Sequence, residues 1–237
     1  MSDLRVDRPP GTSAVVRARL DAPARRNALT MATVADLRDL LRDDPDSTLL
    51  LGSTTPGIFS AGADLDADDA TRARISDTLY ECYRLMVTRP GIVIAVVDGA
   101  AVGGGAQLCA ATDLRTISAA ARWRWVGPGH GLSVGGWILP DLLGRSRGLD
   151  LALTGRWMDA DEAVRAGFAA RVDDDPWQRA SGIADALGRC DADAVAHVKQ
   201  IATRPALLDA LTRERERNAP WTGSAPSARE ASRASRE

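Results

Sequence analysis

The first part of the chain alternates between short apolar runs and longer amphipathic stretches. From Ala14 to Leu20, apolar and charged residues alternate with the period of a strand that buries one face. Thr30 then precedes a stretch in which Val34, Leu37 and Leu41 recur at helical spacing. The pattern therefore predicts a strand followed by a helix whose N-terminus is capped by the Thr30 side chain.

The same alternation of strand and helix continues towards the middle of the chain. Leu49 to Leu51 read as a short buried strand that enters a loop at residues 53–57, and residues 71–88 follow as a second amphipathic helix. Gly91 to Val97, rich in β-branched residues, is the clearest core strand. A glycine-rich bend comes next, and we expect a helix from Gly104 to Ala111 after it.

Beyond Asp113 the pattern predicts one more strand, a Gly- and Trp-rich loop at 122–136, and mostly helix to about Leu211. An α/β layer followed by helices is the fold class that this order favours. We divide the chain into an α/β core (1–190), a C-terminal helical segment (191–223) and a Ser/Ala/Arg/Glu-rich tail expected to be disordered (224–237).

Composition limits the class of partner. The 237 residues are 45% hydrophobic, enough to bury one large core. The 30 basic and 32 acidic residues are spread along the chain and give a net charge of -2, so we expect no nucleic-acid partner.

The cysteines and the hydropathy limit the compartment. Cys82, Cys109 and Cys190 are odd in number and lack CxxC spacing, which argues against a disulfide framework and against a zinc site; we expect no metal. No run reaches the roughly 18 apolar residues of a membrane span, and the N-terminus does not resemble a signal peptide. The chain is therefore expected to lack a membrane span and to reside in the cytoplasm.

Two turns carry small residues where the backbone must come close to something. One runs from Phe59 to Asp64 and contains Gly62, and the other is Gly103-Gly104-Gly105 at the start of the predicted helix. A helix N-terminus offers unpaired N–H groups with partial positive charge, so such a pair can bind an oxyanion. Glycines that only form tight turns are the alternative reading of either motif alone.

Several motifs occur in a defined order between about Val15 and Lys199. They are Leu20-Asp21-Ala22-Pro23-Ala24-Arg25-Arg26-Asn27-Ala28-Leu29, Phe59-Ser60-Ala61-Gly62-Ala63-Asp64-Leu65, Asp98-Gly99-Ala100-Ala101-Val102-Gly103-Gly104-Gly105, Asp113-Leu114-Arg115, Gly135-Gly136, Leu143-Gly144-Arg145, Leu153-Thr154-Gly155 and Asp161-Glu162-Ala163-Val164-Arg165-Ala166-Gly167. Together they resemble the crotonase superfamily, also called the enoyl-CoA hydratase/isomerase family. The resemblance implies a spiral of ββα units followed by a C-terminal helical segment.

The resemblance also implies a ligand and an assembly. An acyl-CoA thioester would bind with its carbonyl between the backbone N–H groups of Ala63 and Gly104, in fatty acid or acyl-CoA metabolism. Arg25 or Arg26 would lie against coenzyme A, although an exposed arginine on a loop is an equal alternative. No cofactor beyond the coenzyme A moiety is implied, and the assembly would be a homotrimer or a dimer of trimers. Further substrate-binding positions implied by the same motifs are Ala28, Ala61, Gly62, Asp64 and Leu65.

The chain departs from that family where hydratases carry two catalytic glutamates. Gln107 occupies the first position and cannot take a proton from water, though it can donate and accept hydrogen bonds. The second position falls near Trp125. Because losing a general acid or base costs roughly 10²–10⁴ in rate, ordinary hydration should be very slow.

Other residues near these positions could support different chemistry. His130, in a glycine-rich loop, is a candidate base, and a hydrogen-bonded bystander is the alternative. Ser133 would mainly bind substrate, whereas Trp123, Trp125 and Trp137 would either shape an apolar acyl pocket or pack in the core. An enzyme of altered chemistry and a non-catalytic fatty acyl-CoA carrier or sensor therefore both stay open.

Two further readings are weaker. Gly131-Leu132-Ser133-Val134-Gly135 matches the nucleophile elbow of serine hydrolases, but Gly127-Pro128-Gly129 interrupts the strand that an elbow needs before its serine. The glycines from Gly99 to Gly105 lack the spacing of a dinucleotide-binding motif. The segment after Ala206 departs most from the family, which leaves pocket closure and assembly open.

Overall fold

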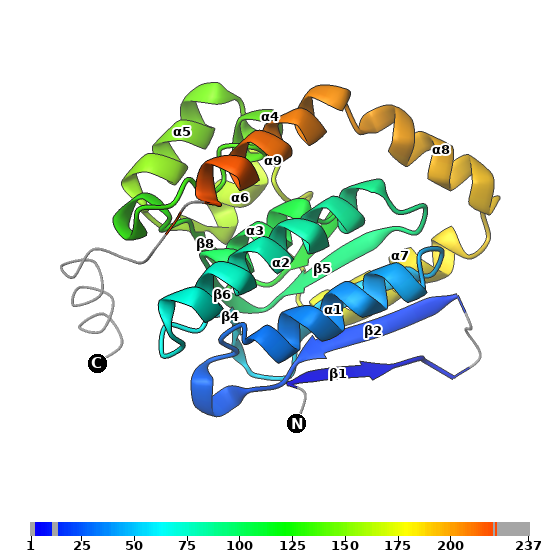
Figure 1. The fold of residues 1–237 in the computed structure, drawn as a ribbon. Coiled ribbons are helices and arrows are strands. Elements are labelled where there is room, and N and C mark those ends of the chain that lie inside the picture. Colours follow the sequence, from blue (N-terminus) through cyan, green and yellow to red (C-terminus); the bar gives the residue numbers. More distant parts are fainter. Residues whose placement is uncertain (1–2, 11–13, 220, 222–237) are drawn as a thin grey trace.

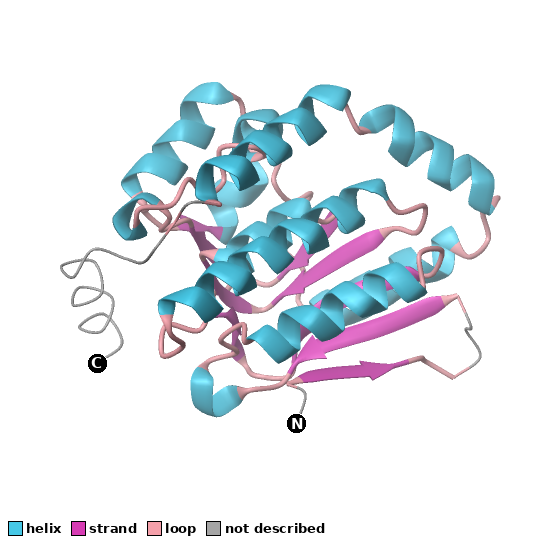
Figure 2. Ribbon diagram, in the orientation of Figure 1, coloured by secondary structure: helices cyan, strands magenta, loops and turns pink. Residues whose placement is uncertain are grey.

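The computed structural model describes residues 3–10, 14–219 and 221 of the chain. Its strands form two sheets covered by helices (Figures 1 and 2). The elements in chain order are β1 (Leu4–Asp7), β2 (Val15–Leu20), η1 (Pro23–Arg25), α1 (Met31–Asp43), β3 (Thr48–Ser53), β4 (Gly57–Ser60), α2 (Asp69–Thr88), β5 (Val93–Val97), β6 (Gly99–Val102), α3 (Gly104–Ala111), β7 (Leu114–Ile117), β8 (Arg122–Arg124), η2 (Pro128–His130), α4 (Leu139–Leu143), α5 (Arg145–Thr154), β9 (Met158–Asp159), α6 (Ala160–Arg165), α7 (Pro176–Leu187), α8 (Ala192–Ala202) and α9 (Pro205–Asn218).

The ββα repeat accounts for the two sheets. The larger sheet has the order β1-β2-β3-β5-β7 and is parallel except for β1. The smaller sheet has the order β4-β6-β8-β9 and is parallel except for β9. From β3 onwards, each repeat places its first strand in the larger sheet and its second in the smaller one, so the chain winds as a spiral; β1 and β2 both lie in the larger sheet. The expected fold class is confirmed.

The central strands β3 and β5 of the larger sheet are buried on both faces, which explains their continuous apolar runs. Leu49, Leu51 and Val93 face the core beneath α1 and α2, while Leu50 and Ile94 face a second cluster formed with α7. Thr30 caps α1 as expected, because its hydroxyl accepts from the Thr33 amide at 3.2 Å.

The short strands of the smaller sheet correct several expectations. Residues 57–60, 99–102 and 122–124 were expected in loops or bends, but each forms a strand. Each has only three or four residues, some of them glycine or charged, so the sequence shows no alternation of apolar and polar residues that would predict a strand. They form strands because they pair with segments distant in the sequence. Helix also extends past Leu211 to Asn218, and the predicted disordered tail at 224–237 lies outside the described residues.

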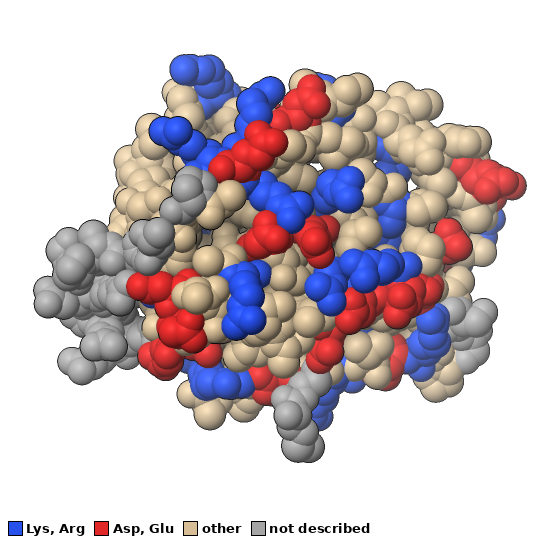
Figure 3. Space-filling view, in the orientation of Figure 1, with Lys and Arg blue, Asp and Glu red and all other residues tan. Residues whose placement is uncertain are grey.

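The C-terminal helices cross the top of the α/β core. Figure 1 shows α8 reaching away at one side and α9 returning over α2. In the described parts of the chain, no helix is long and apolar enough to cross a membrane. Acidic and basic side chains are interspersed over the face shown in Figure 3.

Candidate functional site

The two glycine-bearing turns converge. Gly62 follows β4 with a φ of +89°, and Gly103 precedes α3 with a φ of +52°. A Cβ atom on Gly62 would lie 2.8 Å from the Val102 carbonyl oxygen and 3.5 Å from the Gly104 nitrogen. Glycine at position 62 is thus required both by the left-handed backbone and by the close approach of the second turn.

The convergence brings Ala63 and Gly104 to the wall of the same cavity. Leu29 N–H donates to the Gly62 carbonyl at 2.8 Å, and Asp64 N–H donates to the Leu29 carbonyl at 3.1 Å, which fixes the turn around Ala63. Gly104 is the first residue of α3, so its N–H group has no acceptor within the helix. Within the described segments, neither Ala63 nor Gly104 uses its amide in a hydrogen bond, and both residues line a cavity of about 540 Å³.

Asn27 holds the loop beside these turns. It is 1% exposed and has a φ of +55°, which asparagine tolerates better than most residues. Its Oδ1 accepts from the Ala22 amide at 2.8 Å, and its Nδ2 donates to Ser53 Oγ at 2.7 Å and to the Phe59 carbonyl at 3.1 Å. The asparagine of the opening motif is therefore a buried structural hub, next to Arg26 on the cavity wall.

Replacing Asn27 with alanine should lower the free energy of unfolding by about 2 kcal/mol, because buried partners are left unsatisfied in a left-handed backbone. Denaturant unfolding measures this. The matched variant Asn27→Gly tolerates the backbone but also loses the hydrogen bonds, so it should recover only part of the loss. Full recovery with glycine would show that the hydrogen bonds contribute little.

The exposed face of the smaller sheet forms one wall of the cavity. Ile58, Ala100 and Arg122 pair in register across β4, β6 and β8, and all three line the cavity. Side chains alternate along β8 and the residue after it, so Trp123 in the strand and Trp125 just beyond it point the other way, where both are 0% exposed and pack edge-on against Phe168. Trp125 is therefore a core residue and not a wall of the acyl pocket.

The third tryptophan of that expectation, Trp137, is also buried, at 2% exposure, and stacks on Tyr83 with ring centroids 6.0 Å apart. Of the six tryptophans, Trp157 and Trp221 line the cavity instead. The Arg122 guanidinium lies 4.7 Å above the Trp157 ring centroid.

The cavity wall is rich in arginine. Among the described residues that line it are His130 and four arginines, namely Arg26, Arg72, Arg122 and Arg124. No aspartate or glutamate is among these described lining residues. Arg25 is turned away and pairs with Asp3. The cavity thus suits an anionic ligand, and of the two neighbouring arginines it is Arg26 that reaches it.

The other predicted site residues divide into two groups. Ala28 is 7% exposed behind the wall, and Asp64 accepts from the Asp66 amide at 3.0 Å within its own turn. Neither lines the cavity, nor does Ser133. Those that line it together with Ala63 and Gly104 are Ala61, Gly62, Leu65, Gln107 and His130.

Ser133 does not sit in a nucleophile elbow. It follows the 3-10 helix η2 and irregular backbone instead of a strand. Its amide donates to Asn218 Oδ1 at 2.9 Å, and His197 lies exposed on α8. In the described residues, no group of three or more His, Cys, Asp or Glu side chains is placed to hold a metal ion.

Gln107 is oriented by its neighbours. Its Oε1 accepts from Trp137 Nε1 at 2.8 Å and from the Gly135 amide at 3.2 Å. With the oxygen committed to two donors, the amide nitrogen is left to donate, and the Tyr80 hydroxyl on the cavity wall is one group that it interacts with. Gln107 therefore offers a fixed hydrogen-bond donor and no base.

A buried carboxylate that the sequence analysis missed lies beside Gln107. Glu214 of α9 is 6% exposed, and its carboxylate accepts from the Gly135 amide at 3.2 Å, the Trp137 amide at 2.9 Å and the Tyr80 hydroxyl at 2.9 Å. Burial raises the pKa of Glu214 to about 7.

A signal for Glu214 exists in the chain. It lies in the run Arg213-Glu214-Arg215-Glu216-Arg217, which resembles a solvated surface. However, it also falls three residues after Leu211, on the apolar stripe that Leu207 begins, so its carboxylate points inward.

Trp221, at the end of the described chain, forms part of the cavity wall. It donates from Nε1 to the His130 carbonyl at 2.9 Å and stacks on Arg72 with 4.9 Å between guanidinium carbon and ring centroid. Burial and the nearby Arg72 charge lower the pKa of His130. Both effects favour the neutral imidazole.

Comparisons with known proteins extend over most of the chain. The family model described as Enoyl-CoA hydratase/isomerase matches residues 11–235. A protein of Mycobacterium leprae named probable enoyl-CoA hydratase echA6 is 34% identical over 167 residues, which are 67% of this chain and 67% of the relative. Probable enoyl-CoA hydratase echA8 of the same species is 30% identical over 213 residues, which are 83% and 81%. A solved structure of an enoyl-CoA hydratase/isomerase from Mycobacterium paratuberculosis has a TM-score of 0.82 at 25% identity and covers 98% of both chains.

Proposed function

Because the chain belongs to the enoyl-CoA hydratase/isomerase family, we propose that it binds an acyl-CoA thioester whose carbonyl oxygen is held by the Ala63 and Gly104 amides. The observation that carries this proposal is the approach of the two turns, with a Gly62 Cβ position 3.5 Å from the Gly104 nitrogen. Two fixed donors in a cavity stabilise negative charge that develops on such an oxygen.

The arginines of the wall support the choice of ligand. Coenzyme A carries phosphates, and guanidinium groups pair with phosphate through parallel hydrogen bonds. Arg26 and Arg122 are exposed at the cavity and so can reach phosphates that remain near solvent. No further cofactor is needed for this binding mode.

Ordinary hydration should be very slow. Gln107 presents a hydrogen-bond donor where hydratases of the family carry their first catalytic glutamate. The position expected for the second glutamate falls near Trp125, which is buried in the core. The oxyanion site still polarises a thioester, so an acid–base reaction of another type is the enzymatic form of the proposal.

A non-catalytic fatty acyl-CoA carrier or sensor is the second candidate. The observation that favours it is the commitment of Gln107 Oε1 to Trp137 and Gly135, because a side chain held in this way cannot activate water. Incubation with crotonyl-CoA and longer enoyl-CoAs, alongside acyl-CoA titrations followed by thermal shift, distinguishes the two. Stabilisation without turnover supports the carrier, and turnover supports the enzyme.

The variant Gly62→Ala tests the oxyanion site itself. Its Cβ would lie 2.8 Å from the Val102 carbonyl oxygen, so the two turns must move apart. We expect acyl-CoA affinity to fall at least about tenfold, the loss that follows when 1.4 kcal/mol of binding free energy disappears. Isothermal titration with crotonyl-CoA measures the change.

Gly57→Ala is the matched control, since Gly57 has a φ of +72° but nothing within 4 Å of its Cβ position. It adds similar backbone strain at a distance from the two amides. Equal affinity losses in both variants would count against the oxyanion site.

The proposal also covers the compartment and the oligomeric state. We propose a cytoplasmic protein, consistent with the free thiols of Cys82, Cys109 and Cys190, and a homotrimer or dimer of trimers. Exposed apolar side chains on α8, Val198 at 69% and Ile201 at 83%, support a contact between subunits. Light scattering coupled to gel filtration tests the assembly.

A further inference from the structure

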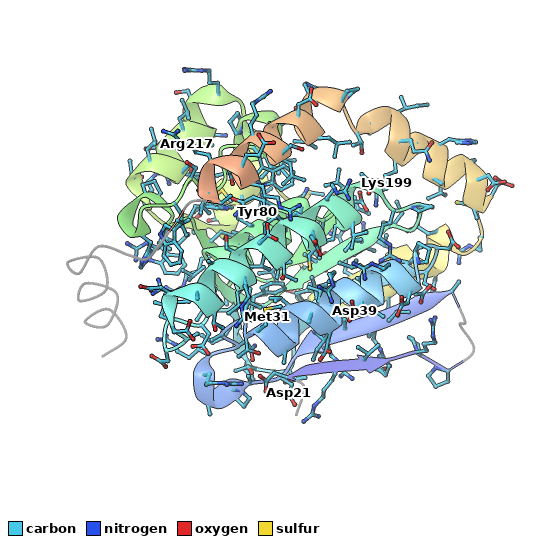
Figure 4. The ribbon with its side chains drawn as sticks, viewed as in Figure 1. Asp21, Met31, Asp39, Tyr80, Lys199 and Arg217 are labelled. Carbon is cyan, nitrogen blue, oxygen red and sulfur yellow. The ribbon has the colours of Figure 1, made fainter. Side chains whose placement is uncertain are left out.

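A tyrosine on the cavity wall is linked to the buried carboxylate behind it. Tyr80 of α2 lines the cavity, and its hydroxyl donates to Glu214 Oε1 at 2.9 Å. Figure 4 marks Tyr80 where α2 passes beneath α9. The pair thus connects the cavity with a carboxylate that does not line it.

Hydrogen-bond donors around Glu214 stabilise its ionised carboxylate, although the group is buried. Besides Tyr80, the Gly135 and Trp137 amides donate to it, at 3.2 and 2.9 Å. Gly135 N–H also approaches Gln107 Oε1 at 3.2 Å. A carboxylate from α9 therefore lies next to the residue that replaces the first family glutamate, so the site lacks that glutamate but keeps one acidic group.

The Tyr80 hydroxyl has the coordination that a proton relay needs. It accepts from Asn218 Nδ2 at 2.7 Å and directs its hydrogen to Glu214, with the Ser133 carbonyl at 3.2 Å as a second acceptor. The Gln107 side chain, which lines the cavity, also interacts with this hydroxyl, so an acyl chain that reaches the tyrosine oxygen takes the place of that contact. Asn218 and Glu214 are one helical turn apart on α9, which holds both on the same side of the tyrosine.

We propose that Tyr80 transfers protons to and from the acyl chain at this site, and that Glu214 is its positioning residue and proton acceptor. The inference rests on the proposed function, because it needs an acyl-CoA with its thioester oxygen at Ala63 and Gly104. It goes further by naming a proton-transfer pair that neither glutamate position of the family supplies.

The step balances within the site. The bond between the substrate α-carbon and hydrogen breaks, its proton binds to Tyr80 Oη, and the tyrosine's own proton passes to Glu214 Oε1. The electron pair moves into the thioester and gives an enolate oxygen, which the Ala63 and Gly104 amides hold. Reversal returns a proton to the α-carbon, and return to the γ-carbon of an enoyl chain would move the double bond.

The ionisation of the groups around Glu214 fits this direction of transfer. Burial raises the pKa of Glu214 to about 7, so the carboxylate form that accepts a proton grows as the pH rises through 7. The titratable groups that face it are Tyr80 and Tyr83 of α2, whose pKa values are raised by burial, so both remain protonated. Residues 133–137 carry no charge, and Arg215 on α9 is turned towards Asp77.

Hydrogen exchange at the α-carbon tests the inference. The full chain is incubated with butyryl-CoA in D₂O, and deuterium in the acyl group is followed by mass spectrometry. We expect exchange in the unmodified protein, a loss of about 10²-fold or more with Tyr80→Phe, and little change in butyryl-CoA affinity. With Glu214→Gln the increase in rate through pH 7 should disappear. Glu216→Gln, an exposed carboxylate on the same helix, should behave as the unmodified protein.

Three results would overturn the inference, and they can be told apart. Exchange that survives Tyr80→Phe but is lost with His130→Ala would assign the base to His130. Measurable binding without exchange would leave the proposed thioester site standing and remove the proton transfer. Absence of binding in the titration would remove both.

Discussion

Replacing Lys199 with alanine is expected to lower the free energy of unfolding by about 3–5 kcal/mol, the usual cost of leaving a buried charge without its partner. Lys199 is the chain's single lysine and is 6% exposed. Its Nζ donates to Asp113 Oδ2 at 2.8 Å and to the carbonyls of Met86 and Gly91 at 2.7 and 3.0 Å. Alanine would leave Asp113 with the Val93 amide as a remaining donor and would remove the donor of the two carbonyls.

Burial explains why the loss should be large. It raises the pKa of Asp113 and lowers the pKa of Lys199, so each group depends on the other for its charge. Guanidinium unfolding at pH 7 measures the change, and a loss below about 1 kcal/mol, the range of exposed pairs, would contradict it.

Arg215→Ala supplies the comparison, since that side chain pairs with Asp77 at 2.6 Å but is 38% exposed. The double variant Lys199→Met with Asp113→Asn removes both charges. The double variant should recover part of the stability lost in Lys199→Ala, because most of that loss comes from the unpaired charge of Asp113 and less from the lost attraction between the two charges.

The second large effect concerns the pH dependence of stability. The folded pKa of Glu214, about 7, exceeds the ordinary value of 4.5, so the folded protein binds more protons than the unfolded chain between these values. The stabilisation is present below pH 4.5 and is lost as the pH rises through 7. About 2.5 pKa units correspond to about 3 kcal/mol.

The difference between two proteins isolates this contribution, because other acids of the chain titrate equally in both. The unmodified protein and Glu214→Gln are unfolded in denaturant at pH 5 and pH 8. The stability of the unmodified protein relative to the variant should fall by about 2.5 kcal/mol between these pH values. Parallel curves would show that the carboxylate is not buried as the structure has it.

The sequence predicts well the elements whose apolar pattern is uninterrupted. The helix after Thr30 has apolar residues at helical spacing, and the stretch from Gly91 to Val97 is continuously apolar, so the burial of both is visible in the sequence. The strands β6 and β8 are invisible there, because three or four small or charged residues become regular only by pairing with distant partners. The spiral could therefore be derived only from the family resemblance.

The candidate site divides in the same way. The motifs placed Ala63, Gly104 and Gln107 on one cavity, because these residues lie in contiguous, recognisable segments. Glu214 and Trp221 reach the site from the C-terminal segment, more than a hundred residues after α3 along the chain. Spacing along the sequence carries no information about such a contact, and the charged run around Glu214 conceals its inward direction.

The alternation along β8 makes the length of that strand intolerant of change. Arg122 and Arg124 face the cavity, while Trp123 and Trp125 fill the core. Inserting or deleting one residue within the strand would reverse the side chains on one side of the change, bringing a guanidinium group into an apolar interior and an indole into water. A change in the length of this segment is therefore expected to be tolerated in the turns on either side of β8 and not within the strand itself.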